Sequence, residues 1–365
     1  MPTGALRVFN GGFGALAALY RWAPLALIMA VVTGCGNFIA RRIAQAPNTY
    51  PTWLAPEAPV TLDFSPKFLT NFPARTVNVG PPQARLRYRV VNPADFHLRV
   101  FPTNWIERGR SQFEFKFRAD IPGPTNKWSA APRGTVFLLH GYGLSQFAMA
   151  PWALSLAEEG WRCVLVDLRG HGKSTGRRIY FGIEETRDLS LLLDDLERGG
   201  KVAAPVAALG ESYGAALALR WKASDPRVGP VVAIAPYASL SNAVLNIRRE
   251  YAGWFPEFLI KSGLKKLPGV LKTPPDNLDI TTVLQKHMES ALFAVGDDDR
   301  ITPLPEVVAL RDLAAPGSRL IIVPKATHES VNFFLNDLLG PVTSWLEDQP
   351  GGTRPAAKPA PGPSP

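Results

Sequence analysis

The chain has few cysteines and histidines, and its N-terminal apolar run is short. Two cysteines among 365 residues, Cys35 and Cys163, exclude a disulfide framework. The apolar run at 23–32 is shorter than the roughly 20 residues that a membrane-spanning helix needs. Lysines and arginines form no block with interleaved aromatic residues, so nucleic-acid binding is not indicated. No internal repeat is found, which argues against a repeat architecture.

The composition is that of a large globular domain with additions at both ends. Hydrophobic residues make up 46% of the chain, enough for a substantial core. The net charge of +9 is spread along the sequence, so it indicates general surface charge that would help at an anionic membrane. Many of the 35 prolines lie towards the two ends. These ends are therefore expected to lie outside the main domain.

The first 34 residues have the pattern of an export signal. Two arginines and no acidic residue precede Cys35, and the apolar segment 23–32 has signal-peptide length. Val32-Thr33-Gly34-Cys35 resembles the lipobox of bacterial lipoproteins, which implies lipidation of Cys35 as the new N-terminal residue. An uncleaved anchor helix and an ordinary cleaved signal are the alternatives. Arg41 and Arg42 argue against the anchor, because positive charge is disfavoured on the translocated side.

These features predict an exported lipoprotein of the cell-envelope membrane. Gly36, and not aspartate, follows the cysteine, which by analogy favours the outer membrane of a two-membrane bacterium. Residues 35–75 are rich in proline and predict a tether that lies against the domain in places. Residues 347–365 predict a disordered Pro-rich tail. The domain itself is expected over 76–346.

Strand and helix patterns alternate through this domain. Period-two alternation predicts antiparallel opening strands of a mixed sheet at 85–91, 97–101 and 113–117. Continuous apolar runs predict buried parallel strands at 135–139, 163–166, 206–209, 231–235, 291–295 and 320–323. Helical patterns are found at 146–159, 184–198, 215–221 and 330–345. The fold class is therefore α/β, with a mostly parallel, doubly wound sheet.

An insertion at about 239–288 interrupts the alternation. It predicts a small helical cap, which could also serve as an apolar lid over an acyl pocket. Pro256 divides its apolar stripe into two short helices. That stripe consists of Tyr251, Trp254, Phe255, Phe258 and Leu259. Lys261, Lys265 and Lys266 are interpreted as a solvated face and not as an anion site.

Gly210-Glu211-Ser212-Tyr213-Gly214 lies between a predicted strand and a predicted helix. A serine on so sharp a turn adopts a strained backbone, and the neighbouring chains come close enough that only glycine fits at the flanking positions. Its hydroxyl then stands at a helix N-terminus, where N–H groups face developing negative charge. The motif predicts a nucleophile at Ser212.

A serine nucleophile needs a base and a carboxylate. His328, in the loop before the last helix, is the candidate base, whereas His140 and His171 lie in tight glycine-flanked loops and are expected to shape those turns. The acid is expected in Asp297-Asp298-Asp299, after the strand at 291–295. A metal site there is disfavoured, because no second acidic cluster with ligand-like spacing accompanies it.

The combined pattern resembles the α/β-hydrolase superfamily, especially its serine esterase, lipase-like and acylaminoacyl-peptidase-like branch. The matching motifs, in the family's order, are His140-Gly141, the D-x-R-G-H-G-x-S loop at 167–174, the elbow at 210–214, the acid loop G-x-x-D-x-x-T-P at 296–303, and the His328 loop. The resemblance implies an α/β-hydrolase fold over about 85–345 and a Ser212–His328–Asp299 triad. It also implies an oxyanion hole formed by the backbone N–H groups of Tyr142 and Tyr213. Asp297 and Asp298 remain alternatives for the acid.

The predicted activity is hydrolysis of a carboxylic ester through an acyl-enzyme. No metal or other cofactor is expected, and the partners are a small acyl substrate and the membrane. A peptidase or thioesterase with the same triad is one alternative. A non-catalytic binding lipoprotein is another, although a binding scaffold has no need of a nucleophile, base and acid together. Glu211 and Tyr213 depart from the residues commonest in the family and leave the substrate open.

Overall fold

The structure is a computed structural model that describes residues 6–7, 35–50, 58–121, 131–287 and 289–348. The predicted signal segment, apart from 6–7, and the predicted tail beyond 348 lie outside the described residues. In the described parts, no helix has both the length and the apolar character needed to cross a bilayer.

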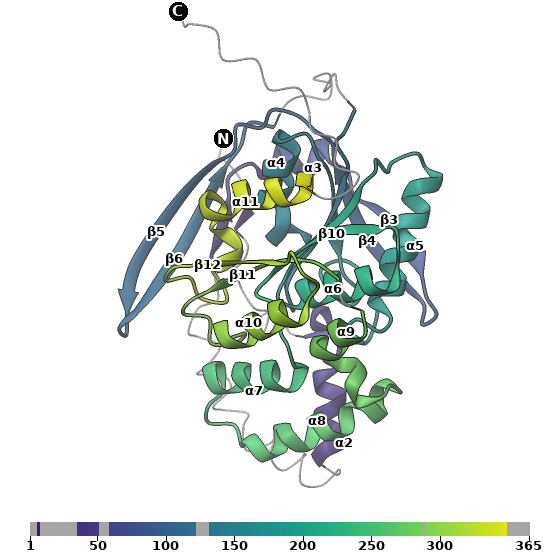
Figure 1. Ribbon diagram of the computed structural model, residues 1–365, viewed down its shortest axis with the longest axis vertical. Coiled ribbons are helices and arrows are strands. Elements are labelled where there is room, and N and C mark those ends of the chain that lie inside the picture. Colours follow the sequence, from purple (N-terminus) through teal and green to yellow (C-terminus); the bar gives the residue numbers. More distant parts are fainter. Residues whose placement is uncertain (1–5, 8–34, 51–57, 122–130, 288, 349–365) are drawn as a thin grey trace, which may run out of the picture.

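An eight-stranded sheet forms the centre of the fold, in the order β12-β11-β10-β9-β7-β8-β4-β3 (Figure 1). Strands β7 to β12 run parallel, and β3 and β4 are antiparallel additions at one edge. The strands are β3 (Arg75–Val79), β4 (Ala84–Val91), β7 (Thr135–Leu139), β8 (Arg162–Asp167), β9 (Val206–Glu211), β10 (Val228–Ile234), β11 (Leu292–Gly296) and β12 (Arg319–Val323). The continuous apolar runs thus form the parallel strands, as predicted, and all are buried except β12, an edge strand that is only partly covered.

Helices cover both faces of this sheet and bury two separate apolar clusters. Phe137 of β7 faces the cluster shared with α5, α6 and α10, whereas Val136 and Leu138 face the cluster shared with α4 and α11. This two-sided burial explains why the strands read as unbroken apolar runs. The covering helices are α4 (Ala150–Glu158), α5 (Glu185–Arg198), α6 (Tyr213–Ser224), α10 (Leu304–Leu313) and α11 (Leu335–Asp348); the short helices η3 (Gln146–Met149) and η5 (Val331–Phe333) precede α4 and α11.

A second, smaller sheet corrects one part of the sequence prediction. The segments 97–101 and 113–117 are strands, β5 (Arg99–Glu107) and β6 (Arg110–Arg118), but they do not open the main sheet. They form a long hairpin in a sheet of order β1-β2-β6-β5, with β1 (Leu6–Arg7) and β2 (Val60–Leu62). Alternation gave β6 one buried face, on which Phe115 and Phe117 pack against Phe333. The pattern identified strands correctly but did not identify their partners.

The segment 35–75, predicted as a tether, contributes ordered structure to the domain wherever it is described. It contains α2 (Cys35–Ile43), η1 (Pro47–Thr49), β2 and α3 (Ser65–Asn71). Helix α2 lies against α8, with Ile39 and Ala40 buried between them. Beyond it, the N–H groups of Ala46 and Asn48 donate to carbonyls of the loop after β8. Small and apolar residues before the first proline of the segment, Pro47, make this packing possible.

The insertion forms helices at one end of the molecule, below the sheet in Figure 1. It contains α7 (Leu240–Tyr251), α8 (Glu257–Leu271), η4 (Pro275–Leu278) and α9 (Ile280–Lys286). Pro256 lies directly before α8 and separates it from α7, as the sequence predicted. Helix α9 contacts α6 and α10, and α8 contacts α2, so the insertion is anchored both to the main domain and to α2.

Candidate active site

Ser212 lies at the junction of β9 and α6 with the backbone strain expected of a nucleophile elbow. Its φ is 51° and its ψ is −110°, which non-glycine residues rarely adopt. A Cβ at Gly210 would lie 2.2 Å from the Gly214 carbonyl oxygen, and one at Gly214 would lie 2.1 Å from that of Leu139. Both flanking positions therefore exclude any side chain. Strand β9 and the start of α6 can approach β7 only because of these two glycines.

Three side chains from separate loops meet at this turn. The Ser212 hydroxyl lies 2.9 Å from Nε2 of His328, and Nδ1 of His328 lies 2.8 Å from Oδ2 of Asp299. Ser212 and His328 reach the surface, whereas the Asp299 side chain is fully buried. The chain of contacts has the form that nucleophile, base and orienting acid require.

The three adjacent aspartates have three different partners, which decides between the candidate acids on geometry. Asp299 contacts His328, whereas Asp297 accepts a hydrogen bond from the Lys325 backbone N–H and Asp298 pairs with Arg300. Asp299 is further fixed by the N–H groups of the two residues that follow Arg300. Its second oxygen is thus held towards the imidazole.

Comparison with known proteins agrees with this architecture. The model of the family described as serine aminopeptidase, S33, matches residues 130–290, which include Ser212 but end before Asp299 and His328. An esterase of Pyrococcus furiosus is 19% identical, with 78% of this chain and 95% of that chain covered and a TM-score of 0.55. An E-2-(acetamidomethylene)succinate hydrolase is 17% identical, with 75% and 98% covered and a TM-score of 0.50. The chain has the α/β-hydrolase fold. No curated protein sequence gives a significant match.

In this α/β-hydrolase fold, the site lies where the order of strand connections reverses. β7 pairs with β8 on one side and with β9 on the other, and ligands bind at such switch points beyond the carboxyl ends of the strands. Tyr142 follows the end of β7, and Tyr213 is the first residue of α6. The N–H groups predicted to form an oxyanion hole therefore belong to neighbouring positions at this edge. Tyr213 contributes the N-terminal end of a helix, which favours negative charge.

The charges around the site favour a protonated imidazole. Burial opposes charge on His328, but the Asp299 carboxylate outweighs it, with help from Glu329 and Glu211, and raises the pKa of His328 to about 9. Burial raises the pKa of Glu211 to about 7, although His328 and the Gly141 backbone favour its charged form. Glu211 is 4% exposed, and its Oε2 has no hydrogen-bond partner among the described residues. The sequence marks Glu211 only as a departure from the residue commonest in the family. It does not predict that the Glu211 carboxylate lies near His328 and favours the protonated imidazole.

The other two histidines of the sequence motifs are structural. Burial lowers the pKa of His140 to about 4 and, together with the neighbouring His140, lowers that of His171 to about 3. Nε2 of His140 accepts the Leu168 N–H, and Nδ1 of His171 lies 2.9 Å from the Arg169 carbonyl oxygen. Both rings stay neutral and brace the loop after β8, as the sequence predicted. Asp167 joins that loop to the start of η3, because its carboxylate accepts the backbone N–H groups of Lys173 and Gln146.

A cleft of about 550 Å³ opens beside His328. Its walls come from the β5–β6 hairpin, the end of α7 and the His328 loop, and the hairpin contributes Trp105 and Arg110. Arg110 pairs with Glu250 of α7, which joins the hairpin to the cap across the cleft. Among the described apolar residues expected to form a lid, Tyr251 lines the cleft, whereas Phe258 is 69% exposed elsewhere. The hairpin was the part of this cleft that the sequence did not predict.

Proposed function

We propose that the protein is a serine hydrolase that cleaves small carboxylic esters, and that lipid on Cys35 holds it at the cell-envelope membrane. The observation that carries the enzymatic part is the continuous contact from Ser212 through His328 to Asp299. The cleft of about 550 Å³ that His328 lines is large enough for a small acyl substrate. The membrane part is supported by the lipobox-like sequence alone.

In the proposed reaction, Nε2 of His328 takes the Ser212 proton as Oγ attacks the acyl carbonyl carbon. The carbonyl π electrons move to oxygen, and the N–H groups of Tyr142 and Tyr213 stabilise that oxyanion. His328 then gives its proton to the departing alkoxide, which leaves an acyl-enzyme and an alcohol. Water attacks the acyl-enzyme with the same base and releases the acid. Asp299 accepts a hydrogen bond from the Nδ1–H of His328 throughout, without taking the proton, and stabilises the imidazolium.

The direct test of the nucleophile is labelling with a fluorophosphonate probe. Wild-type protein should be labelled on Ser212, and a folded Ser212→Ala variant should be neither labelled nor active on p-nitrophenyl esters. Equal labelling of the two proteins would reject Ser212. Ser224 provides a control, because its hydroxyl donates to the Trp221 carbonyl oxygen within α6. Ser224→Ala should therefore leave labelling unchanged.

The matched family's description favours one alternative substrate class, the aminoacyl amides. The test is the rate of hydrolysis of a panel of short and long acyl esters, thioesters and aminoacyl amides by the wild-type protein. The Ser212→Ala variant gives the background rate for each substrate. Faster turnover of aminoacyl amides than of every ester would replace the ester assignment. Loss of palmitate labelling and membrane fractionation in a Cys35→Ser variant tests the anchor separately.

A further inference from the structure

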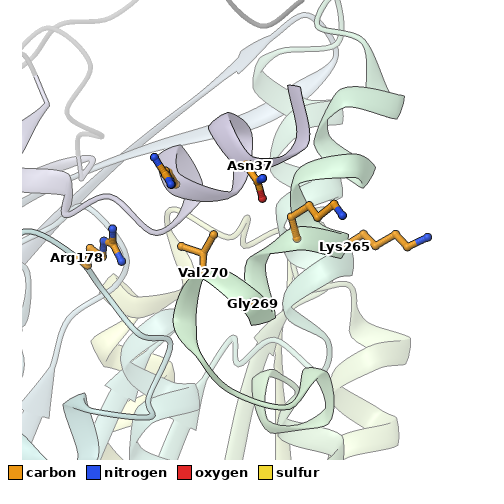
Figure 2. Close-up of a pocket in the computed structure, with 7 residues that line it drawn as sticks. Asn37, Arg178, Lys265, Gly269 and Val270 are labelled. Atoms are coloured by element: carbon orange, nitrogen blue, oxygen red, sulfur yellow. The ribbon is translucent and has the colours of Figure 1, made fainter. Parts of the chain in front are cut away.

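A second hollow, which we call the basic groove, lies between α2 and α8 and shares no lining residue with the cleft. Its volume is about 410 Å³, and it is lined by Asn37, Arg41, Arg178, Lys265, Lys266, Gly269 and Val270. Figure 2 shows Asn37 on α2 and Lys265 on α8, with Arg178 approaching from the loop before α5. The groove therefore gathers cations that are far apart in the sequence. None of these lining residues, all in the described part of the chain, is acidic.

The four cations of the basic groove are exposed and unpaired within the described structure. No carboxylate of the described residues forms an ion pair with Arg41, Arg178, Lys265 or Lys266. Lys261, one turn earlier on α8, shows the contrast, because it pairs with Glu257 at 2.8 Å. Four like charges around one hollow repel each other unless an anion joins them. The α8 lysines are exposed, as interpreted from the sequence, and the packing of α2 on α8 places two of them beside Arg41 and Arg178.

The position of the groove points to a membrane surface as the source of that anion. Helix α2 begins at Cys35, the predicted lipid site, and packs closely on α8. A Cβ at Gly263 would lie 2.3 Å from Ile39, so the two helices meet without room for a side chain there. A lipid at Cys35 would thus be joined directly to the helix pair that forms the groove, with no long linker between them. Phe258, 69% exposed and seven residues before Lys265, lies on the same face of α8.

We propose that the α2–α8 end of the protein docks on anionic phospholipid, with the basic groove taking a lipid phosphate and Phe258 entering the interface. This inference rests on the proposed membrane location but not on the hydrolytic chemistry. A lysine or arginine at an anionic lipid surface strengthens binding roughly 5-fold, so the unpaired charges of the groove account for a large preference. The attraction falls as salt is raised, because screening shortens its range.

The test is co-sedimentation of the full chain with vesicles, in a Cys35→Ser background so that covalent lipid does not contribute. Vesicles of phosphatidylcholine alone are compared with vesicles containing phosphatidylglycerol. The groove variant carries Arg41→Gln, Lys265→Gln and Lys266→Gln. The parent protein should prefer the anionic vesicles, and the groove variant should lose about 100-fold of that binding. Equal binding of parent and groove variant to anionic vesicles, or no preference in the parent, would overturn the proposal.

A matched control separates position from net charge. The exposed residues Arg75, Arg85 and Arg198 lie on β3, β4 and α5, none of them lines the basic groove, and their replacement by glutamine removes the same charge. This control variant should bind anionic vesicles nearly as the parent does; a loss equal to that of the groove variant would reject a specific surface. Displacement by inorganic phosphate, but not by chloride of equal ionic strength, would instead assign the groove to a free phosphate. All variants should retain p-nitrophenyl ester hydrolysis, so failure of the proposed activity is detected independently.

Discussion

Asp299→Asn offers the sharpest test of the site, because the structure fixes what each carboxylate oxygen does. Oδ1 accepts the N–H groups of Ile301 at 2.9 Å and Thr302 at 2.7 Å. Oδ2 accepts the Thr302 hydroxyl at 2.9 Å and lies 2.8 Å from Nδ1 of His328. An asparagine keeps the two backbone bonds only if its oxygen replaces Oδ1. Its amide nitrogen then faces His328.

That nitrogen donates where the carboxylate accepted. Nδ1 of His328 must become the acceptor, so the imidazole proton moves to Nε2, the atom 2.9 Å from the Ser212 hydroxyl. A protonated Nε2 cannot take the serine proton. In a serine protease with this constellation, the same substitution lowers kcat by about 10⁴, equivalent to roughly 5.5 kcal/mol of barrier. We expect a loss of that order in Asp299→Asn, with little change in melting temperature because both backbone hydrogen bonds survive.

The assay is steady-state hydrolysis of a p-nitrophenyl ester, with thermal unfolding measured on the same samples. Asp298→Asn is the matched control, since it makes the same chemical change one residue away on a carboxylate that pairs with Arg300. It should keep kcat within a few-fold of wild type, whereas KM can change because Asp298 lines the cleft. A folded Asp299→Asn enzyme with wild-type kcat would refute the tautomer argument, and a large loss in Asp298→Asn alone would move the acid to that position.

Two further predictions concern the elbow. Wild-type kcat/KM should rise with pH up to about 9 as His328 loses its proton. Glu211→Gln should move this rising limb of the pH profile to lower pH, because removing a neighbouring carboxylate destabilises the imidazolium. A limb at the same pH in both proteins would exclude this electrostatic role of Glu211. Gly214→Ala should lower the free energy of unfolding in urea by more than about 3 kcal/mol, since its Cβ would lie 2.1 Å from the Leu139 carbonyl oxygen. The control is Gly340→Ala on α11, whose Cβ would meet nothing within 4 Å and which should be neutral or stabilising.

The sequence contained most of the information about the sheet and the triad because both depend on local chemistry. Buried parallel strands must be apolar on both faces, and the elbow must have glycine at 210 and 214, so both leave clear patterns. The order Ser212, Asp299, His328 then follows from the loops at the carboxyl ends of β9, β11 and β12. The structure adds the contacts among them and the choice among the three aspartates.

What the sequence could not predict depends on contacts between distant segments. The alternation in β6 predicts a half-buried strand, but nothing local shows that its partner is β2 and not β4. For the same reason, Trp105 could not be placed in the cleft. Arg41 and Lys265 each read as a surface charge, and only the packing of α2 on α8 brings them to one groove.

The cap joins the cleft to the basic groove. Helix α7 ends at the cleft, where the Tyr251 hydroxyl donates to Glu329, and Arg248 ties α7 to the start of α8 through Glu257 at 3.5 Å. A membrane that holds α8 would therefore also fix the direction in which the cleft faces. Because no groove residue lines the cleft, the groove variant should hydrolyse a soluble p-nitrophenyl ester normally but should act more slowly on an ester presented in anionic vesicles. Equal rates of wild type and variant on the vesicle-bound ester would show that docking does not serve catalysis.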